Sequence, residues 1–288
     1  MYCWSFSARK QSAGHISKTR DPCLNKAMAN ERLISLAAGV IPELMDNPSR
    51  FVEIAASTGW KGTGVWFDPF SWTDKTTVEV AKRIEDAGLE AVDMEVIRLG
   101  PKADHGEALI EAAIAVGAKN ILTVSSYPTM EETAERLTEL CLLASERNIC
   151  ICLEFMRFTS VKNLSDALST VAMVEADNVG VLVDLLHVHR SGTSYDEIAS
   201  VDPALFPYVQ WCDAKVEPVG WSDKNLITDA LDDRMIPGEG ELPVAAFTSL
   251  FDESVPFAIE VRSKALRDGF PIYEDRSRHL LDLTLAAL

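Results

Sequence analysis

Four polar residues, each at or near the end of a separate apolar run, are of the types that could together hold one metal ion. They are Glu154, Asp184, Gln210 and Glu260. An ionised carboxylate at the end of a buried strand is costly unless a cation or another partner compensates it. Three carboxylates and one amide oxygen, recurring in this way along the chain, therefore predict oxygen ligands for one hard divalent ion.

The types of donor also predict which ion is bound. All four side chains offer oxygen, which favours Mg²⁺ or Mn²⁺ over Zn²⁺ or Cu²⁺. Three carboxylates carry one negative charge more than a divalent ion neutralises. We therefore expect Mn²⁺ or Mg²⁺ to act as a Lewis acid, binding a hydroxy-carbonyl substrate by displacing water.

Three basic residues lie close to these candidate ligands in the sequence. His187 follows Asp184 by three residues, where a strand passes into the next helix, and is predicted to act as an acid/base or substrate contact. Arg190 and Arg262 are predicted to bind a substrate carboxylate or oxyanion. The alternative for both arginines is that they only neutralise the carboxylate cluster.

Two further residues end neighbouring apolar runs. Glu95 is predicted to point toward the same site and bind substrate hydroxyls, with a salt bridge to Arg98 as the alternative. Trp66 is predicted to wall a sugar-sized pocket, although a large aromatic side chain in such a run is more often part of the core.

Short apolar runs alternate with amphipathic segments from residue 33 onward. The runs predict strands over Leu33–Ala38, Gly64–Phe67, Ala91–Val96, Asn120–Ser125, Ile149–Phe155, Val179–Asp184, Tyr208–Asp213 and Phe257–Val261. The segments predict helices that include Thr76–Ala87, Gly106–Val116, Met130–Arg147, Leu164–Val174 and a closing helix over Asp275–Leu288.

This alternation predicts an α/β fold with a single domain, a (β/α)8 TIM barrel over residues 33–288. A doubly wound open sheet is the rival, but the first strand–helix turn lacks the expected Gly-x-Gly-x-x-Gly. Active sites of such barrels lie at the carboxyl ends of the strands, where the four polar residues would meet. The longest connection, residues 214–242, is predicted to be a lid or binding loop.

Residues 1–32 differ from the rest because they are basic and lack periodicity. We expect an extension outside the barrel, either disordered or produced by a misassigned start; a transit peptide is the alternative.

The charge balance excludes several classes of partner. The net charge is −17 and no basic stripe offsets it, so no nucleic acid or anionic membrane partner is expected. No apolar run reaches the roughly 18 residues of a membrane span. The six cysteines contain no Cys-x-x-Cys pair, and four fall within apolar elements. These features predict free thiols and a cytoplasmic location.

The segments CLEF, VDLLHVHRSG, VQWCDAK, IPGEGELP and IEVRS resemble the xylose isomerase-like TIM-barrel superfamily. The resemblance covers the chain from about residue 33 to the end. It implies Glu154, Asp184, the strand-seven position and Glu260 as metal ligands. Gln210 stands where most members have a metal-binding His, and this variant resembles the 3-dehydroshikimate dehydratase branch.

Three functions are compatible with these residues. The first is a metal-dependent isomerase or epimerase of a small sugar or keto-sugar, in which Glu154 and Glu260 transfer a proton next to a metal-bound carbonyl through an enediolate. The second is a lyase in which the same enolate expels a β-hydroxyl, with His187 as acid/base. The third is a non-catalytic sugar-binding subunit. In each case the ligand is a small polyhydroxy carbonyl compound, and the family resemblance makes a homo-oligomer possible.

Overall fold

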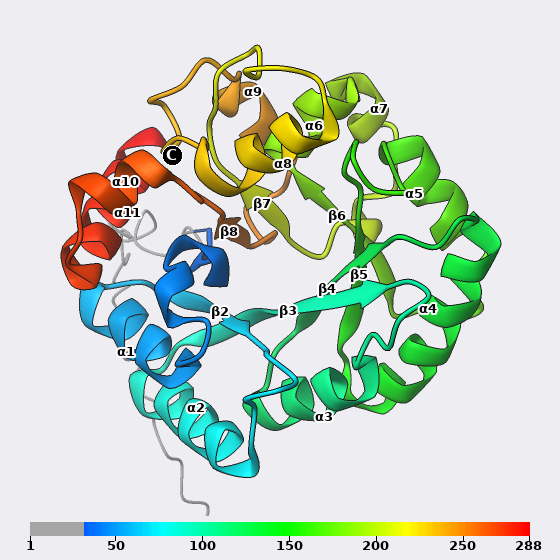
Figure 1. Cartoon of the computed structure of the whole chain (residues 1–288), viewed down its shortest axis with the longest axis horizontal. Coiled ribbons are helices and arrows are strands. Elements are labelled where there is room, and N and C mark those ends of the chain that lie inside the picture. Colours follow the sequence, from blue (N-terminus) through cyan, green and yellow to red (C-terminus); the bar gives the residue numbers. More distant parts are fainter. Residues whose placement is uncertain (1–31) are drawn as a thin grey trace, which may run out of the picture. The chain divides into compact units, whose positions relative to one another are not determined.

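The computed structural model describes residues 32–288, which form a closed barrel of eight parallel strands surrounded by helices (Figure 1). Each strand pairs with its neighbours in sequence, and β8 closes the ring against β1, with Ile34 opposite Phe257 and Leu36 opposite Ile259. The predicted (β/α)8 barrel is therefore confirmed. The expectation for residues 1–31 lies outside the described residues.

All eight predicted strands are present. They are β1 (Ile34–Leu36), β2 (Gly62–Trp66), β3 (Glu90–Leu99), β4 (Asn120–Ser125), β5 (Cys150–Glu154), β6 (Val179–Asp184), β7 (Val209–Trp211) and β8 (Phe257–Ile259). The bounds of β4 and β6 match the prediction at both ends. Strands β1, β7 and β8 are shorter than predicted, whereas β3 is longer and carries irregularities in its register with β2 and β4.

The helices begin and end at residues whose side chains or backbone suit those positions. They are α1 (Pro48–Thr58), α2 (Asp74–Ala87), α3 (Gly106–Val116), α4 (Met130–Ala144), α5 (Leu164–Val171), α6 (Leu185–Ser191), α7 (Tyr195–Ala199), α8 (Asp223–Asp232), α9 (Val244–Thr248), α10 (Lys264–Gly269) and α11 (Tyr273–Ala287). Thr73 and Thr129 form capping boxes at the start of α2 and α4. Gly88 and Gly117 end α2 and α3 in the left-handed conformation, which glycine adopts without a steric penalty.

The predicted loop over residues 214–242 is mostly ordered structure. It contains α8, and Asp213 fixes its last part. One carboxylate oxygen of Asp213 accepts hydrogen bonds from the amides of Gly238 and Gly240 at 3.0 and 2.9 Å, and the other accepts from Leu242 at 2.9 Å. The connection thus contains a helix and a fixed last part, and four of its residues line the cavity at the carboxyl end of the barrel, so its role as a lid or binding loop stays a prediction.

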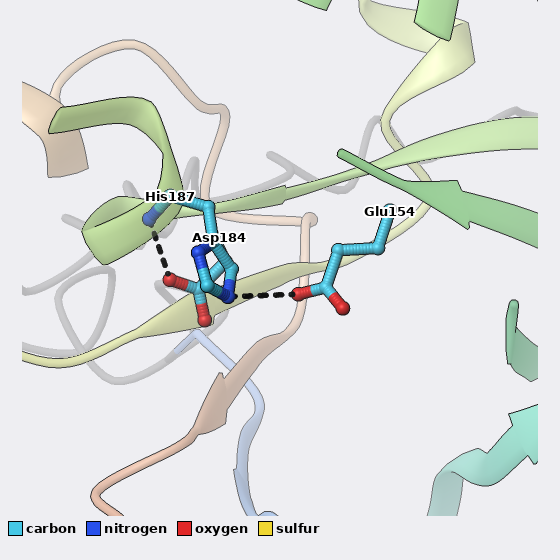
Figure 2. A group of neighbouring side chains, drawn as sticks. All are labelled: Glu154, Asp184 and His187. Atoms are coloured by element: carbon cyan, nitrogen blue, oxygen red, sulfur yellow. Dashed lines mark hydrogen bonds and ion pairs between the residues drawn. The ribbon is translucent and has the colours of Figure 1, made fainter. Parts of the chain in front are cut away.

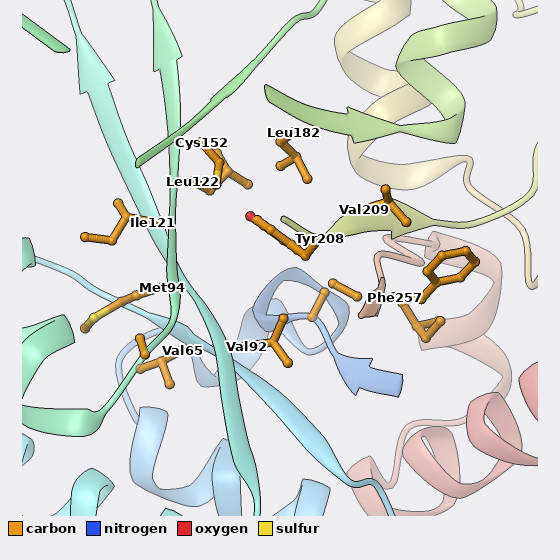
Figure 3. Close-up of a cluster of buried hydrophobic side chains, with 14 of the residues drawn as sticks. Val65, Val92, Met94, Ile121, Leu122, Cys152, Leu182, Tyr208, Val209 and Phe257 are labelled. Atoms are coloured by element: carbon orange, nitrogen blue, oxygen red, sulfur yellow. The ribbon is translucent and has the colours of Figure 1, made fainter. Parts of the chain in front are cut away.

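A fully buried layer supports the four candidate ligands. Side chains two positions apart on a strand face the same side. The residues two positions before the candidate ligands are Cys152, Leu182, Tyr208 and Ala258, and none has measurable solvent exposure. Figure 3 shows the first three of them together in the barrel. The ligand positions therefore rest on packed side chains, which limits their movement.

Two further properties concern the helices and the cysteines of the described residues. None of the helices within residues 32–288 is long and apolar enough to span a membrane. Cys141, Cys150, Cys152 and Cys212 are free thiols, as predicted.

Candidate active site

Glu154, Asp184, Gln210 and Glu260 lie together at the carboxyl end of the barrel. Glu154 and Asp184 are the last residues of β5 and β6, Gln210 lies within β7, and Glu260 directly follows β8. In the sheet, Asp184 pairs with Gln210, which in turn pairs with Ala258. All four side chains are buried, with no more than 5% of any residue exposed.

Glu154, Asp184 and His187 form the tightest group of potential metal ligands (Figure 2). One ligand atom from each lies within 4.8 Å of the others. Nε2 of His187 is 3.8 Å from Oε1 of Glu154. Asp184 also caps helix α6, because its Oδ1 accepts a hydrogen bond of 3.2 Å from the backbone amide of His187. The helix cap thus fixes the spacing between Asp184 and His187.

The carboxamide of Gln210 bridges two carboxylates. One end of it lies 3.2 Å from Oε1 of Glu154 and 3.1 Å from Oδ2 of Asp184. If the nitrogen occupies that end, it donates to both carboxylates. If the oxygen occupies it, three oxygens face one another, an arrangement that is stable only around a cation. Gln210 can therefore serve as a hydrogen-bond donor in one state and as a metal ligand in the other.

Arg234 is a site residue that the sequence interpretation did not select. Its Nη1 donates to Oδ2 of Asp184 at 2.6 Å and lies 3.3 Å from Sγ of Cys212. Its Nε donates to the carbonyl of Ala230 at 2.9 Å, and the side chain is buried. Arg234 follows α8, fifty residues beyond Asp184, so no local sequence pattern connects the two. The signal available in the sequence is an arginine two residues before the Ile236-Pro237-Gly238 turn.

Burial dominates the electrostatics of the acidic residues. It raises the pKa of Glu154 well above its usual value, with the charge of Asp184 adding to the effect and that of Arg234 opposing it. Burial also raises the pKa of Glu260, while Arg234 and Arg262 oppose the shift. The imidazole of His187 has its pKa lowered to about 4 by burial, so it is neutral at physiological pH.

The donor set fits a divalent cation. Oε2 of Glu260 and Nδ1 of His187 are buried without a hydrogen-bond partner among the described residues. Buried polar atoms are rarely left in this state unless water or an ion satisfies them. The oxygens of Glu154, Asp184, Gln210 and Glu260 suit a hard ion, and the neutral imidazole of His187 adds a nitrogen donor nearby.

All of these side chains except that of Asp184 line a cavity of about 300 Å³. Of the predicted substrate-binding residues, Trp66, Glu95 and Arg262 line it, together with Glu154, His187, Gln210 and Glu260. Apolar residues complete the wall: Val96, Leu122, Val124, Met156 and Phe158 are among them. The alternative salt bridge between Glu95 and Arg98 does not form among the described residues, and burial raises the pKa of Glu95 well above its usual value.

Arg190 lies elsewhere, contrary to its predicted place beside the substrate. Its Nε donates to Asp229 at 2.7 Å, and its two terminal nitrogens donate to the carbonyls of Val216 and Lys215 at 2.8 and 2.7 Å. It is buried and does not line the cavity. The guanidinium of Arg190 instead links α6 to α8 and to the segment that follows β7, since each of its three nitrogens donates a hydrogen bond there.

Comparison with known proteins assigns the chain to a family. The family model described as "Xylose isomerase-like TIM barrel" matches residues 52–282. The chain belongs to this family. It is 30% identical over 157 residues to an inosose isomerase of Bacillus velezensis, an alignment that covers 51% of this chain and 54% of the relative. The chain thus spans about half the length of the curated relatives that it matches.

Two solved structures extend the comparison to most of the barrel. The structure of the IOLI protein with a bound zinc atom has a TM-score of 0.70 at 17% identity, covering 88% of this chain and 95% of the other. The structure of a probable 3-DHS dehydratase, AsbF of Bacillus anthracis, has a TM-score of 0.67 at 17% identity, covering 86% and 98%. At this level of identity both comparisons establish the fold alone.

Proposed function

We propose that this chain is a divalent-metal-dependent isomerase or epimerase that acts on a small sugar or keto-sugar. The observation that carries the proposal is the convergence of Glu154, Gln210 and Glu260 on one cavity of about 300 Å³, with Asp184 next to Gln210. The inosose isomerase relatives support this class of reaction. The IOLI structure, which holds a zinc atom, supports a divalent ion.

Glu154, Asp184, Gln210 and Glu260 would hold the ion, with His187 next to Glu154. When bound, a divalent ion supplies Lewis-acid polarisation of a substrate carbonyl. Mn²⁺ and Mg²⁺ remain our proposal for its identity, because the four donors are oxygens. Trp66 and the apolar residues of the wall would exclude water and position the carbon chain of the substrate.

The two glutamates have the properties that proton transfer needs. Both line the cavity, and they come from β5 and β8, three strands apart around the barrel. Burial raises the pKa of both carboxyl groups, and a carboxylate with a raised pKa is a stronger base. We infer that one glutamate removes the proton next to the carbonyl and that the other returns it. The neutral His187 and Glu95 would bind the substrate hydroxyls.

A dehydratase is the second candidate, and Gln210 is the observation that favours it. Its carboxamide replaces the histidine expected at strand seven, and the AsbF structure is among the similar barrels. Proton removal next to a carbonyl is common to both reactions. In the dehydratase the following step expels a β-hydroxyl as water instead of returning the proton.

The two reactions differ in what they do with solvent protons. The protein, loaded with Mn²⁺, would be incubated with inosose and with ketohexoses in deuterated water. Incorporation of deuterium into recovered sugar without loss of water is expected. A conjugated-enone absorbance with release of water would support the dehydratase and refute the isomerase. A protein that retains no Mn²⁺ after incubation with the ion and acts on none of these compounds would support a non-catalytic sugar-binding protein.

The four free thiols and the acidic charge are consistent with a cytoplasmic enzyme that acts on a small molecule, and we propose that location.

A further inference from the structure

Arg98 lies where two cavities meet. The first is the catalytic cavity of about 300 Å³ described above, and the second, of about 280 Å³, lies on the side of β2 and β3. Trp66, Val96 and Arg98 line both. The two cavities therefore share a wall, and the only charged residue in that wall is Arg98.

The guanidinium of Arg98 is exposed to solvent and open to an incoming ligand. It forms no hydrogen bond and no ion pair with any residue between 32 and 288, and Nε of Arg262 is buried without a partner in the same part of the chain. The other two arginines nearby are fully engaged: Arg190 with Asp229 and two carbonyls, and Arg234 with Asp184 and Ala230. Leaving the buried Nε of Arg262 without an acceptor is costly unless water or a ligand supplies one, and the exposed donors of Arg98 are available to the same ligand.

Arg98 and Arg262 are close enough to repel each other. Burial lowers the pKa of Arg98, Glu95 and Glu154 oppose the effect, and the charge of Arg262 lowers it further. An anion next to both guanidinium groups would remove this repulsion and would accept their hydrogen bonds.

Once a divalent ion is bound, the positive charges of Arg98 and Arg262 exceed the negative charge that remains in the site. Glu154, Asp184 and Glu260 carry three negative charges, which a divalent ion and Arg234 balance. Glu95 adds little negative charge, because burial favours its neutral form. Arg98 and Arg262 then contribute two positive charges that no described residue neutralises by an ion pair.

The second cavity does not supply the missing anion. Asp104 accepts two hydrogen bonds from Arg136, both of 2.9 Å, and Asp68 accepts from the amide of Phe70 and the hydroxyl of Ser71. The rest of the wall is mostly apolar or aromatic: Phe67, Pro69, Phe70, Ala103 and Leu109 line it. The carboxylates near Arg98 in this cavity are thus already satisfied by other groups.

We propose that the substrate carries an anionic group, a phosphate ester or a carboxylate, at the end of its carbon chain remote from the reacting carbonyl. Arg98 binds this group where the two cavities meet, and Arg262 contributes from the side of Glu260. The proposal rests on the proposed function, since it takes the first cavity as the place where the sugar carbonyl reacts. It restricts the substrate class from neutral sugars to sugar phosphates or sugar acids.

Substrate preference tests the proposal directly. We expect the metal-loaded wild-type protein to prefer D-fructose 6-phosphate or a keto-uronate to D-fructose by at least about tenfold in kcat/KM, which corresponds to about 1.4 kcal/mol. The better of the two anionic compounds identifies phosphate or carboxylate. In the variant Arg98→Gln this preference is expected to fall by at least about tenfold, mainly through KM. Equal or better turnover of the neutral ketose by the wild type would overturn the proposal.

Arg83→Gln is the matched control, because Arg83 is a surface arginine that pairs with Glu53 on the outside of the barrel. It should leave the preference unchanged. If no ketose is turned over, the proposed function fails and binding alone decides the present inference. In that case the melting temperature is measured with inorganic phosphate and with chloride at equal ionic strength. A phosphate-specific increase that Arg98→Gln abolishes supports the anion site, and no increase in the wild type refutes it.

Discussion

Nη1 of Arg234 lies 2.6 Å from Oδ2 of Asp184, although fifty residues separate them along the chain. Both side chains are buried, so each charge compensates the other in a place that water does not reach. Arg234 is therefore the built-in cation of the site. It allows β6 to end on a carboxylate whether or not a metal ion is bound.

Replacing Arg234 with methionine should destabilise the metal-free protein by about 3 kcal/mol or more, because it leaves the charge of Asp184 buried and unpaired. Mn²⁺ should restore part of this loss, since the ion supplies the missing positive charge. Urea unfolding with EDTA and with Mn²⁺ measures both effects. A variant as stable as the wild type in EDTA would mean that Asp184 does not depend on Arg234.

The barrel could be predicted because the sequence patterns that specify its strands and helices are local. The apolar runs over Asn120–Ser125 and Val179–Asp184 coincide with β4 and β6, and the predicted helix ends at Ala87 and Val116 coincide with the ends of α2 and α3. Each of these signals depends on a few neighbouring residues. A barrel also converts strand ends into neighbours, which is why Glu154 and Asp184 could be placed together from sequence.

The part of the site that depends on non-local contacts could not be predicted. Arg234 reaches Asp184 only because α8 folds back within the connection after β7, and that helix was not foreseen. Arg190 follows Asp184 closely in sequence, yet its side chain points to Asp229 in α8. Sequence spacing located the strand ends correctly, but it does not specify which partner a long flexible side chain selects.

Arg190 and Asp229 offer a test of a structural ion pair. Arg190→Met should cost about 3 kcal/mol in unfolding free energy, because Asp229 keeps a buried charge without a partner. The double variant with Asp229→Leu should recover part of that loss, since both charges are then removed. Urea unfolding of the two single variants and the double variant gives the coupling energy. A double variant whose loss equals the sum of the two single losses would show that the pair is not coupled.

Gly39 is expected to be required for activity more than for stability. A Cβ atom at this position would lie 2.7 Å from Oε1 of Glu260 and 2.9 Å from Cδ of Arg262. Both are far along flexible side chains and can move, so Gly39→Ala should change the melting temperature little. Displacing Glu260 should lower kcat by roughly 10²-fold.

Gly269→Ala is the control for that variant, because nothing lies within 4 Å of its added Cβ. It should match the wild type in both melting temperature and kcat. If Gly39→Ala retains wild-type activity, the position of Glu260 is not critical to the reaction.

Gln210 can be tested as a metal ligand by two substitutions. Gln210→Ala removes the donor next to Glu154 and Asp184, so Mn²⁺ affinity should fall by at least about tenfold. Gln210→His keeps a neutral donor but should shift the preference toward Zn²⁺, because imidazole suits that ion better. Isothermal titration with Mn²⁺ and Zn²⁺ measures both. Unchanged Mn²⁺ binding by Gln210→Ala would remove Gln210 from the ligand set.

Asp93 should make the metal-free protein less stable as the pH rises from about 4 to about 7. It lies on β3, fully buried, and both of its carboxylate oxygens lack a hydrogen-bond partner among the described residues. Burial and the charge of Glu260 raise its pKa from the usual 3.8 to about 7. Between these two values the unfolded chain has released the proton and the folded protein keeps it, so ionisation favours unfolding.

Asparagine does not ionise. The variant Asp93→Asn should therefore become more stable relative to the wild type as the pH rises through this range. The difference in unfolding free energy should grow by up to about 4 kcal/mol from pH 4 to pH 7 and stay constant above it. For Asp104→Asn, the pH-dependent difference in unfolding free energy from the wild type should have the opposite sign. Burial of Asp104 raises its pKa, but hydrogen bonds from Arg136 and Gly106 outweigh this and leave the pKa below its usual value. Urea unfolding at several pH values in EDTA measures both, and a pH-independent difference for Asp93→Asn would show that Asp93 is already ionised in the folded protein.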